Sequence, residues 1–192
     1  MKVPFRLQAS EYDCVPTTFL NAISFLFSRG EIPPIVIQKI YTYTLDTVSK
    51  INTLGHGTTG IAVEMLGKWL ANFKDKKFSV STEYFTGENV HLKPRSKILK
   101  TLKGGGVVLL HVNPWHYILA ISCDENFIYC FDPYPLTKNN EEGRLEFVDQ
   151  NGSQSHNLKI HIDWLDTKSN RKKYALGANL NRECLLLSRD CL

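Results

Sequence analysis

The chain has 192 residues, of which 43% are hydrophobic, 22% charged and 11% aromatic. These proportions are those of an ordinary globular protein and exclude a collagen, a low-complexity linker and a disordered acidic tail. A chain of this length hides about 70% of its extended surface on folding, so a single domain over residues 1–192 needs no disulfide or metal to hold its core. The formal net charge of +4 is too small to indicate nucleic-acid binding by itself.

The sequence also constrains where the protein works. No apolar run reaches the roughly 18 residues of a membrane-spanning helix, and residues 1–8 lack the apolar core and cleavage site of a secretory signal. We therefore expect no membrane insertion and a cytoplasmic location. Export by a route that needs no secretory signal is left open. Five cysteines without a two-residue spacing fit neither a disulfide framework nor a zinc ribbon, so at least one thiol is free.

Helices dominate the first part of the chain. Apolar residues at helical spacing predict a helix over residues 15–27, with Asp13 at its N-cap and Pro16 in its first turn. The same pattern predicts helices over residues 33–45 and 58–74.

Strands dominate the chain beyond residue 76. Alternating or continuous apolar runs, separated by turn residues and by one short helix over residues 94–103, predict strands over residues 77–85, 107–112, 115–122 and 127–132. The polar extension over residues 135–192 offers two more candidates, residues 158–162 and 183–187. Helices first and an antiparallel sheet after them indicate an α+β fold.

Cys14 is the one cysteine at the expected start of a helix. Unpaired N–H groups and the partial positive charge of a helix N-terminus stabilise a thiolate, so Cys14 is a candidate nucleophile. A small, buried residue that merely begins the helix is the alternative.

A nucleophilic cysteine needs a histidine base and a group that orients it. If residues 122 and 126 close a three-residue hairpin loop, His116 lies directly opposite Asp132, within reach of a carboxylate–imidazole hydrogen bond. A pair on the hairpin surface is the alternative. His111 is the rival base, but it lies in an apolar run without an evident carboxylate partner.

The other candidate features are weaker. His56 fits a loop near a cleft, and His91, His156 and His161 have no expected partner. The basic run over residues 168–173 lacks the interleaved aromatic residues of a nucleic-acid site, so we interpret it as a solvated loop. Gln8, six residues before Cys14, is placed to donate its amide to an oxyanion hole together with the backbone N–H of the nucleophile.

These segments together resemble a known family. The run Gln8 to Cys14, the strand that His116 opens, the Asp132-Pro133 pair and the run Gly57-Thr58-Thr59 are similar to the papain-like cysteine peptidases of the bacteriocin-processing, double-glycine type. The likeness covers about residues 5–134.

The resemblance implies a papain-like fold, with the nucleophile at a helix N-terminus in an N-terminal helical part that packs on a C-terminal antiparallel sheet. It also implies Cys14 as nucleophile, His116 as base and acid, Asp132 as its orienting group and Gln8 as oxyanion donor. Val15-Pro16 follows the cysteine where transporter-linked members have small residues, which favours a stand-alone peptidase-like protein over an export-coupled one.

The sequence therefore predicts a thiol hydrolase of peptide or isopeptide bonds, acting on a peptide or protein substrate. Acyl transfer to an amine by the same triad, and a catalytically silent peptide-binding module, are the alternatives. No cofactor or metal is expected, because the chemistry needs none and the sequence has no phosphate loop, dinucleotide fingerprint or ligand cluster. The sequence does not indicate an oligomeric state.

Overall fold

The computed structural model describes residues 1–50, 53–135, 141–149 and 152–191. The helices are α1 Cys14–Leu26, α2 Pro34–Tyr43, α3 Gly60–Asn72, α4 Lys97–Lys103 and α5 Ile162–Leu165, with short 3-10 turns at Arg29–Glu31, Gly87–Asn89 and Asn179–Asn181. The strands are β1 Val80–Thr86, β2 Val107–Val112, β3 His116–Cys123, β4 Phe127–Phe131, β5 Leu145–Phe147, β6 Leu158–His161 and β7 Glu183–Arg189. The predicted α+β class is confirmed, with N-terminal helices packed on an antiparallel sheet.

The sheet does not follow the order of the chain. Its seven strands run β1-β7-β2-β3-β4-β6-β5, and each neighbouring pair is antiparallel. The C-terminal strand β7 lies between β1 and β2, so the polar last quarter of the chain supplies a central strand. The sequence indicated strands there but not this insertion, because pairing between distant strands leaves no local pattern.

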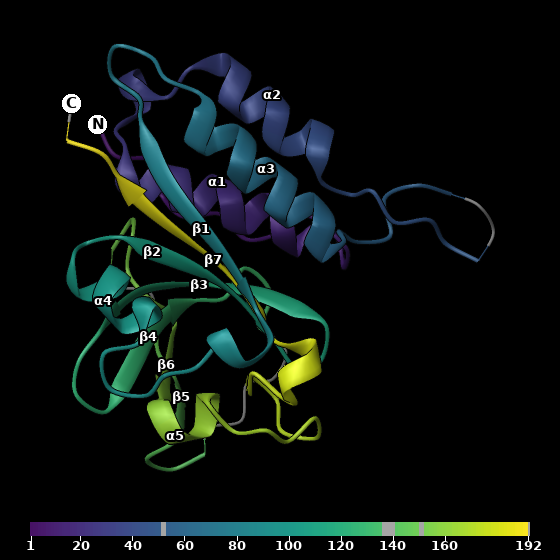
Figure 1. Ribbon diagram of the computed structural model, residues 1–192, viewed down its shortest axis with the longest axis vertical. Coiled ribbons are helices and arrows are strands. Elements are labelled where there is room, and N and C mark those ends of the chain that lie inside the picture. Colours follow the sequence, from purple (N-terminus) through teal and green to yellow (C-terminus); the bar gives the residue numbers. More distant parts are fainter. Residues whose placement is uncertain (51–52, 136–140, 150–151, 192) are drawn as a thin grey trace.

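Two hydrophobic cores lie on the two faces of the sheet (Figure 1). Helices α1, α2 and α3 cover one face, and α4 and α5 lie against the other. Val107 and Leu109 of β2 enter the first core while Val108 and Leu110 enter the second, as alternation along a strand requires. This is why β2 is a continuous apolar run rather than an alternating one.

Close packing between α3 and β7 depends on Gly67. A Cβ atom at this position would lie 2.7 Å from Leu185 Cδ1, so only a residue without a side chain lets the helix approach the strand this closely. The first core is therefore closed by a residue from the last ten positions of the chain.

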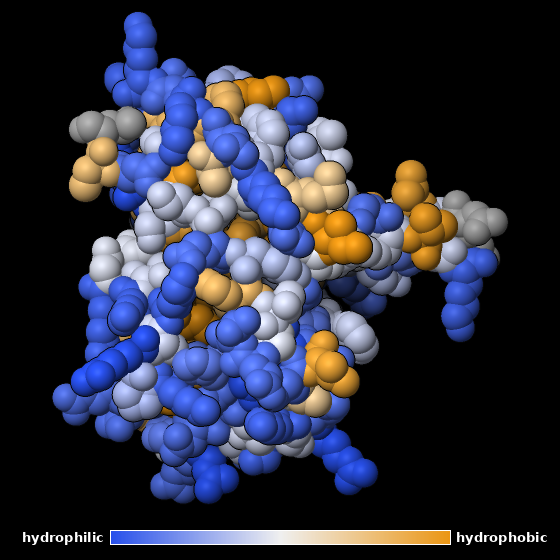
Figure 2. All heavy atoms as spheres, viewed as in Figure 1, coloured by the Kyte–Doolittle hydropathy of each residue, from blue (hydrophilic) through white to orange (hydrophobic). Residues whose placement is uncertain are grey.

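Between α2 and α3 the chain leaves the body of the molecule. Figure 1 shows residues 44–50 and 53–59, here called the arm, projecting to one side. An isolated bridge between Val48 and Leu54 ties its two halves together. Both side chains are exposed, and Figure 2 shows apolar surface on the arm.

Leu185→Ala should lower the free energy of unfolding by about 2–5 kcal/mol, because it opens a cavity where Leu185 is fully buried between the sheet and α3. Urea unfolding measures this effect. Leu180→Ala is the matched control, since Leu180 is 98% exposed and should change stability by less than about 0.5 kcal/mol. Equal effects of the two substitutions would contradict a central position for β7.

Candidate active site

Cys14 is the first residue of α1 and its side chain is 9% exposed. Asp13 occupies the N-cap position, but its side chain does not cap the helix. It turns back instead to accept hydrogen bonds from the backbone N–H groups of Ala9, at 2.9 Å, and Ser10, at 2.7 Å. Burial disfavours the charged carboxyl, yet these hydrogen bonds outweigh it and lower the pKa of Asp13.

The predicted N-cap position of Asp13 is therefore confirmed, but two N–H groups of the preceding turn bind its carboxylate in place of the helix. Among the described residues, the backbone N–H groups of Cys14 and Val15 have no acceptor. The start of α1 thus keeps unpaired donors beside the thiol.

His116 and Asp132 are joined by a direct hydrogen bond between their side chains. His116 Nε2 lies 2.7 Å from Asp132 Oδ1, and the side chains are 5% and 0% exposed. The structure thus brings these two predicted residues together as a buried pair rather than as the surface pair that was the alternative.

The hairpin register that predicted this contact is nevertheless wrong. Leu119 pairs with Phe131, so Asp132 lies two residues away from the position opposite His116. The two side chains therefore meet across the diagonal between neighbouring strands, a distance that an extended ring such as imidazole can span.

A β-bulge keeps them on one face of the sheet. At the turn, Cys123 pairs with Ile128, and the register shifts by one residue between Ala120 and Ser122. Without that shift His116 and Asp132 would point to opposite faces, since each one-residue slip reverses the side chains. The predicted three-residue loop gave the correct face because the turn and the bulge together shift the register by two residues, and an even shift leaves side chains on the same face.

Asp132 is held by residues from the last quarter of the chain. The hydroxyl of Tyr174, a fully buried residue, donates to Asp132 Oδ2 at 2.5 Å, and the backbone N–H of Tyr134 donates to Oδ1 at 2.8 Å. Asn157 fixes the Asp132 backbone by accepting from its N–H, at 2.7 Å, and donating to its carbonyl, at 2.8 Å. Sequence reasoning missed Tyr174 and Asn157, since neither lies in a motif or near Asp132 in the chain.

The Cys14 thiol lies beside the His116 imidazole, close enough to raise its pKa. Because Nε2 of the imidazole is bonded to Asp132, Nδ1 is the nitrogen left for the thiol. Burial opposes protonation of His116, but the hydrogen bonds with Asp132 and Cys14 outweigh it and raise its pKa to about 9.

Gln8 lies on the approach to α1, and its backbone N–H donates to the Pro133 carbonyl at 3.0 Å, next to Asp132. Its side-chain Nε2 donates to the Ser10 carbonyl at 2.5 Å, and Oε1 is buried without a partner among the described residues. The amide has a second N–H, but Gln8 is not among the residues that line the cleft. Its part in an oxyanion hole stays a prediction.

A cleft of about 490 Å³ opens beside the nucleophile. It is lined by residues of the turn before α1, the arm and the start of α3, β2 and β3, and β7: Glu11, Tyr12, Cys14, Val15, Thr47, His56, Gly57, Thr58, Thr59, Gly60, His111, Trp115, Tyr117 and Glu183. The Gly57-Thr58-Thr59 run is fixed there by Asp46, whose carboxylate accepts from the Thr59 N–H at 2.8 Å and from its hydroxyl at 2.6 Å.

The rival histidines differ from His116. His111 lines the cleft, but its Nδ1 lies 3.2 Å from the Asn181 carbonyl and 4.0 Å from Glu183, and burial lowers its pKa. His56 also lines the cleft, and its ring centroid lies 4.4 Å from that of Tyr12 with the two rings tilted by 50°. Neither has a carboxylate within hydrogen-bond distance among the described residues.

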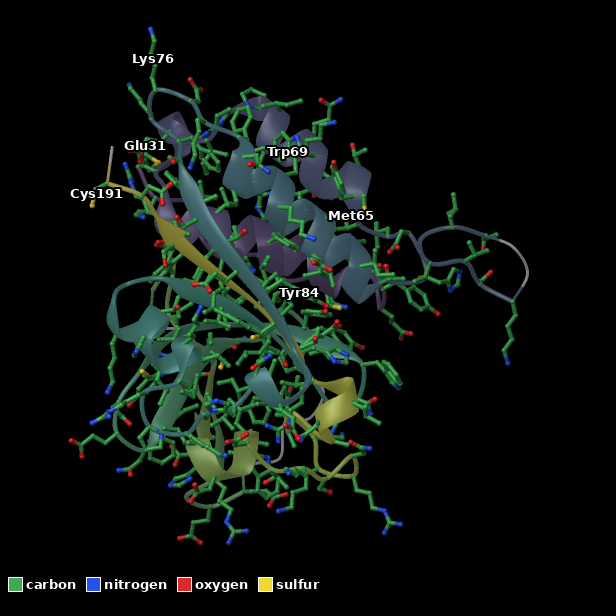
Figure 3. All side chains as sticks on the ribbon, viewed as in Figure 1. Glu31, Met65, Trp69, Lys76, Tyr84 and Cys191 are labelled. Carbon is green, nitrogen blue, oxygen red and sulfur yellow. The ribbon has the colours of Figure 1, made fainter. Side chains whose placement is uncertain are left out.

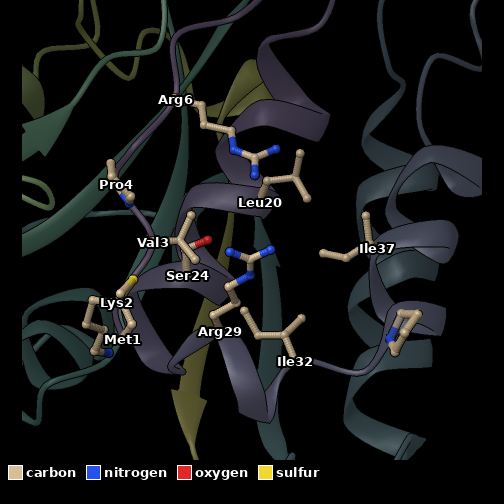
Figure 4. Close-up of a pocket in the computed structure, with 11 residues that line it drawn as sticks. Met1, Lys2, Val3, Pro4, Arg6, Leu20, Ser24, Arg29, Ile32 and Ile37 are labelled. Atoms are coloured by element: carbon tan, nitrogen blue, oxygen red, sulfur yellow. The ribbon is translucent and has the colours of Figure 1, made fainter.

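A second cavity of about 470 Å³ lies away from these residues, between the N-terminal segment, α1 and α2 (Figure 4). None of the four predicted site residues lines it. In the described part of the chain, no group of three His, Cys, Asp or Glu side chains is arranged to hold a metal ion. No helix there is long and apolar enough to cross a membrane.

Comparison with known proteins gives limited guidance. Residues 58–151 match the family model described as herpesvirus tegument protein, N-terminal conserved region; this stretch contains His116 and Asp132 but not Cys14. One similar solved structure is that of a double glycine motif protease from an AMS/PCAT transporter, in complex with the leader peptide. The alignment covers 98% of this chain and 93% of the protease chain, with 13% sequence identity and a TM-score of 0.46. No curated protein matches the chain. The functional argument therefore depends on the geometry of the site.

Stability should depend on pH through His116. With a pKa of about 9 in the folded protein and an ordinary value of about 6.5 in the unfolded chain, protonated His116 stabilises the fold fully below pH 6.5, and this contribution is lost as the pH rises through 9. The gap corresponds to about 3 kcal/mol. Urea unfolding at pH 6 and pH 9.5 should show this fall in the wild type and a smaller one in His116→Gln. The same fall in both proteins would contradict the shift.

Proposed function

We propose that the chain is a papain-like cysteine hydrolase that cleaves a peptide or isopeptide bond through a thioester on Cys14. The observation that carries the proposal is the grouping of Cys14, His116 and Asp132, with 2.7 Å between His116 Nε2 and Asp132 Oδ1 and the Cys14 thiol beside the same imidazole. A nucleophile, a base in contact with it and a third group that orients the base are the parts that covalent acyl chemistry requires.

In the first half of the reaction, the Cys14 sulfur attacks the carbonyl carbon of the substrate. The raised pKa of His116 supplies an imidazolium beside the thiol, which stabilises a thiolate. The C–N bond then breaks as His116 gives its proton to the departing amine. The acyl group remains on Cys14 as a thioester.

In the second half, His116 takes a proton from water, and the hydroxide formed attacks the thioester carbonyl. The C–S bond breaks, the carboxylic acid leaves, and His116 keeps the proton from water, which restores the imidazolium beside the Cys14 thiolate. Asp132 holds the imidazole in place through both halves and stabilises its charged form without accepting its proton.

Two donors are available for the oxyanion that forms at each attack. The first is the backbone N–H of Cys14, which has no acceptor among the described residues. The second we assign to the Gln8 side-chain amide, which has one N–H beyond the one that it donates to the Ser10 carbonyl. Donors of this kind act on charge that develops in the transition state.

Turnover tests these assignments. A library of fluorogenic peptides and isopeptides should yield a substrate whose cleavage falls to background in Cys14→Ala. Turnover should fall by about 10²–10⁴-fold in Asp132→Asn and by about 10²–10³-fold in Gln8→Ala. The matched controls Cys191→Ala, Asp163→Asn and Gln38→Ala, all at exposed positions, should keep wild-type rates.

Other outcomes of this experiment would change the assignment. Cleavage that survives Cys14→Ala would place the nucleophile elsewhere. Product formation only when an amine acceptor is added would replace hydrolysis by acyl transfer. Binding of peptides without any turnover would replace the enzyme by a binding module.

Thiol alkylation separates activation of Cys14 from simple accessibility. Cys191 is exposed while Cys14 is 9% exposed, so accessibility alone would make Cys191 react faster. If His116 activates its partner, iodoacetamide at pH 6 should modify Cys14 first, and His116→Ala should slow that reaction about 10-fold or more. Peptide mapping by mass spectrometry measures both rates. Burial raises the pKa of Cys130 and Cys184, so both should stay unmodified, whereas faster labelling of Cys191 would contradict activation.

A further inference from the structure

Glu183, the first residue of β7, places a carboxylate in the wall of the cleft that contains Cys14. Its side chain is 19% exposed. The hydroxyl of Tyr84, which Figure 3 labels on β1, donates to Oε2, and the hydroxyl of Tyr117 on β3 donates to Oε1. The triad mechanism does not use this carboxylate.

The charge on Glu183 has no cationic partner among the described residues. Its nearest basic group is His111, whose Nδ1 lies 4.0 Å from Oε1 and donates instead to the Asn181 carbonyl, at 3.2 Å. Burial lowers the pKa of His111 more than the Glu183 charge raises it, so this imidazole is neutral near pH 7. Two neutral tyrosines and a neutral imidazole leave the negative charge uncompensated.

The start of α3 explains how this charge is tolerated. A Cβ atom on Gly60 would lie 2.0 Å from Glu183 Oε2, so the glycine lets the helix N-terminus come against the carboxylate. The partial positive charge of a helix N-terminus and the two tyrosine hydroxyls stabilise an anion. The two hydroxyls occupy only part of the hydrogen-bonding capacity of the Glu183 carboxylate, because a carboxylate has about four acceptor positions.

The rest of the cleft favours the same kind of ligand. A second acid, Glu11, lines it, and none of its lining residues is a lysine or arginine, although the chain has 23 of them. The cavity between the N-terminal segment, α1 and α2 is different: Arg6 and Arg29 both direct their guanidinium groups into it (Figure 4). The absence of lysine and arginine from the lining therefore distinguishes the cleft beside Cys14 from that cavity.

Aromatic rings complete the lining. Tyr12 and Trp115 line the cleft and are 43% and 81% exposed, and Tyr117 lies between Cys14 and Glu183 in the same wall. The faces of such rings attract cations. A cationic side chain in this cleft would thus meet a carboxylate at one end and aromatic faces along its length.

We propose that Glu183 determines specificity by binding a cationic side chain, lysine or arginine, of a peptide that occupies the cleft. This inference deepens the proposed function and rests on it for the identity of the cleft as the substrate site. Glu183 touches substrate in this scheme and takes no part in bond breaking.

Binding to the Cys14→Ala variant tests the inference without turnover. The probes are fluorescent peptides in matched pairs that carry lysine or its uncharged analogue norleucine at each position in turn. At one position the lysine peptide should bind about 10-fold more tightly or better, as expected of a charge-assisted hydrogen bond. Added salt should weaken this preference.

Three further substitutions in the Cys14→Ala background identify the residue responsible. Glu183→Gln should remove the preference for lysine while norleucine peptides bind as before, which also shows that the cleft is folded. Glu183→Asp, which keeps the charge, should retain part of the preference and serves if Glu183→Gln does not fold. Glu83→Gln is the matched control, since Glu83 is an exposed residue of β1 that pairs with Lys97 outside the cleft, and it should leave the preference unchanged.

The outcomes for the two proposals are distinct. No preference for lysine at any position, or a preference that survives Glu183→Gln, overturns the inference about Glu183. If the lysine preference is present but wild-type protein cleaves nothing, the inference stands and the proposed hydrolase activity fails. If Cys14-dependent cleavage occurs without any charge preference, the hydrolase stands and the inference fails.

Discussion

Asp132 is completely buried, and a buried carboxylate must be surrounded by hydrogen-bond donors. Segments from several distant parts of the chain meet at Asp132 to supply these donors. Its two oxygens accept from His116, Tyr174 and the Tyr134 backbone, while Asn157 fixes its own backbone. The donors come from β3, from the end of β4 and from the segment that precedes β7. Because the imidazole is oriented by this carboxylate, the position of the base relative to Cys14 depends on the last quarter of the chain as much as on the first.

Local patterns in the sequence predicted the parts of the fold that depend on local physics. The helix over residues 15–27 appears as α1 one residue earlier, since its apolar spacing, its Pro16 and its end all act within one element. The contact between His116 and Asp132 followed from side-chain alternation, which survives a register error of two. The bulge between Ala120 and Ser122 could not be predicted, because one unpaired backbone residue leaves no pattern of side chains.

The unpredicted features depend on contacts between distant residues. Tyr174 lies 42 residues beyond Asp132 in a polar stretch, and only the anchoring of residues 174 and 175 to Asn113 brings it under the site. Glu183 opens a strand whose neighbours in the sheet, β1 and β2, precede it by more than 70 residues. Asp13 occupies its predicted N-cap position, but the sequence pattern does not show that two backbone N–H groups of its own turn bind the carboxylate in place of the helix.

Asp132 and Glu183 differ in what neutralises their charges, and in the two proposals this difference separates catalysis from recognition. Asp132 faces an imidazole whose pKa it helps to raise to about 9, so its charge is balanced within the protein whenever His116 is protonated. Glu183 faces tyrosine hydroxyls and a helix N-terminus, which stabilise its charge without cancelling it. A substrate cation that binds Glu183 therefore does not compete with His116 for its counter-ion. The same cleft can then attract a basic peptide and still keep the imidazolium that the thiolate of Cys14 requires.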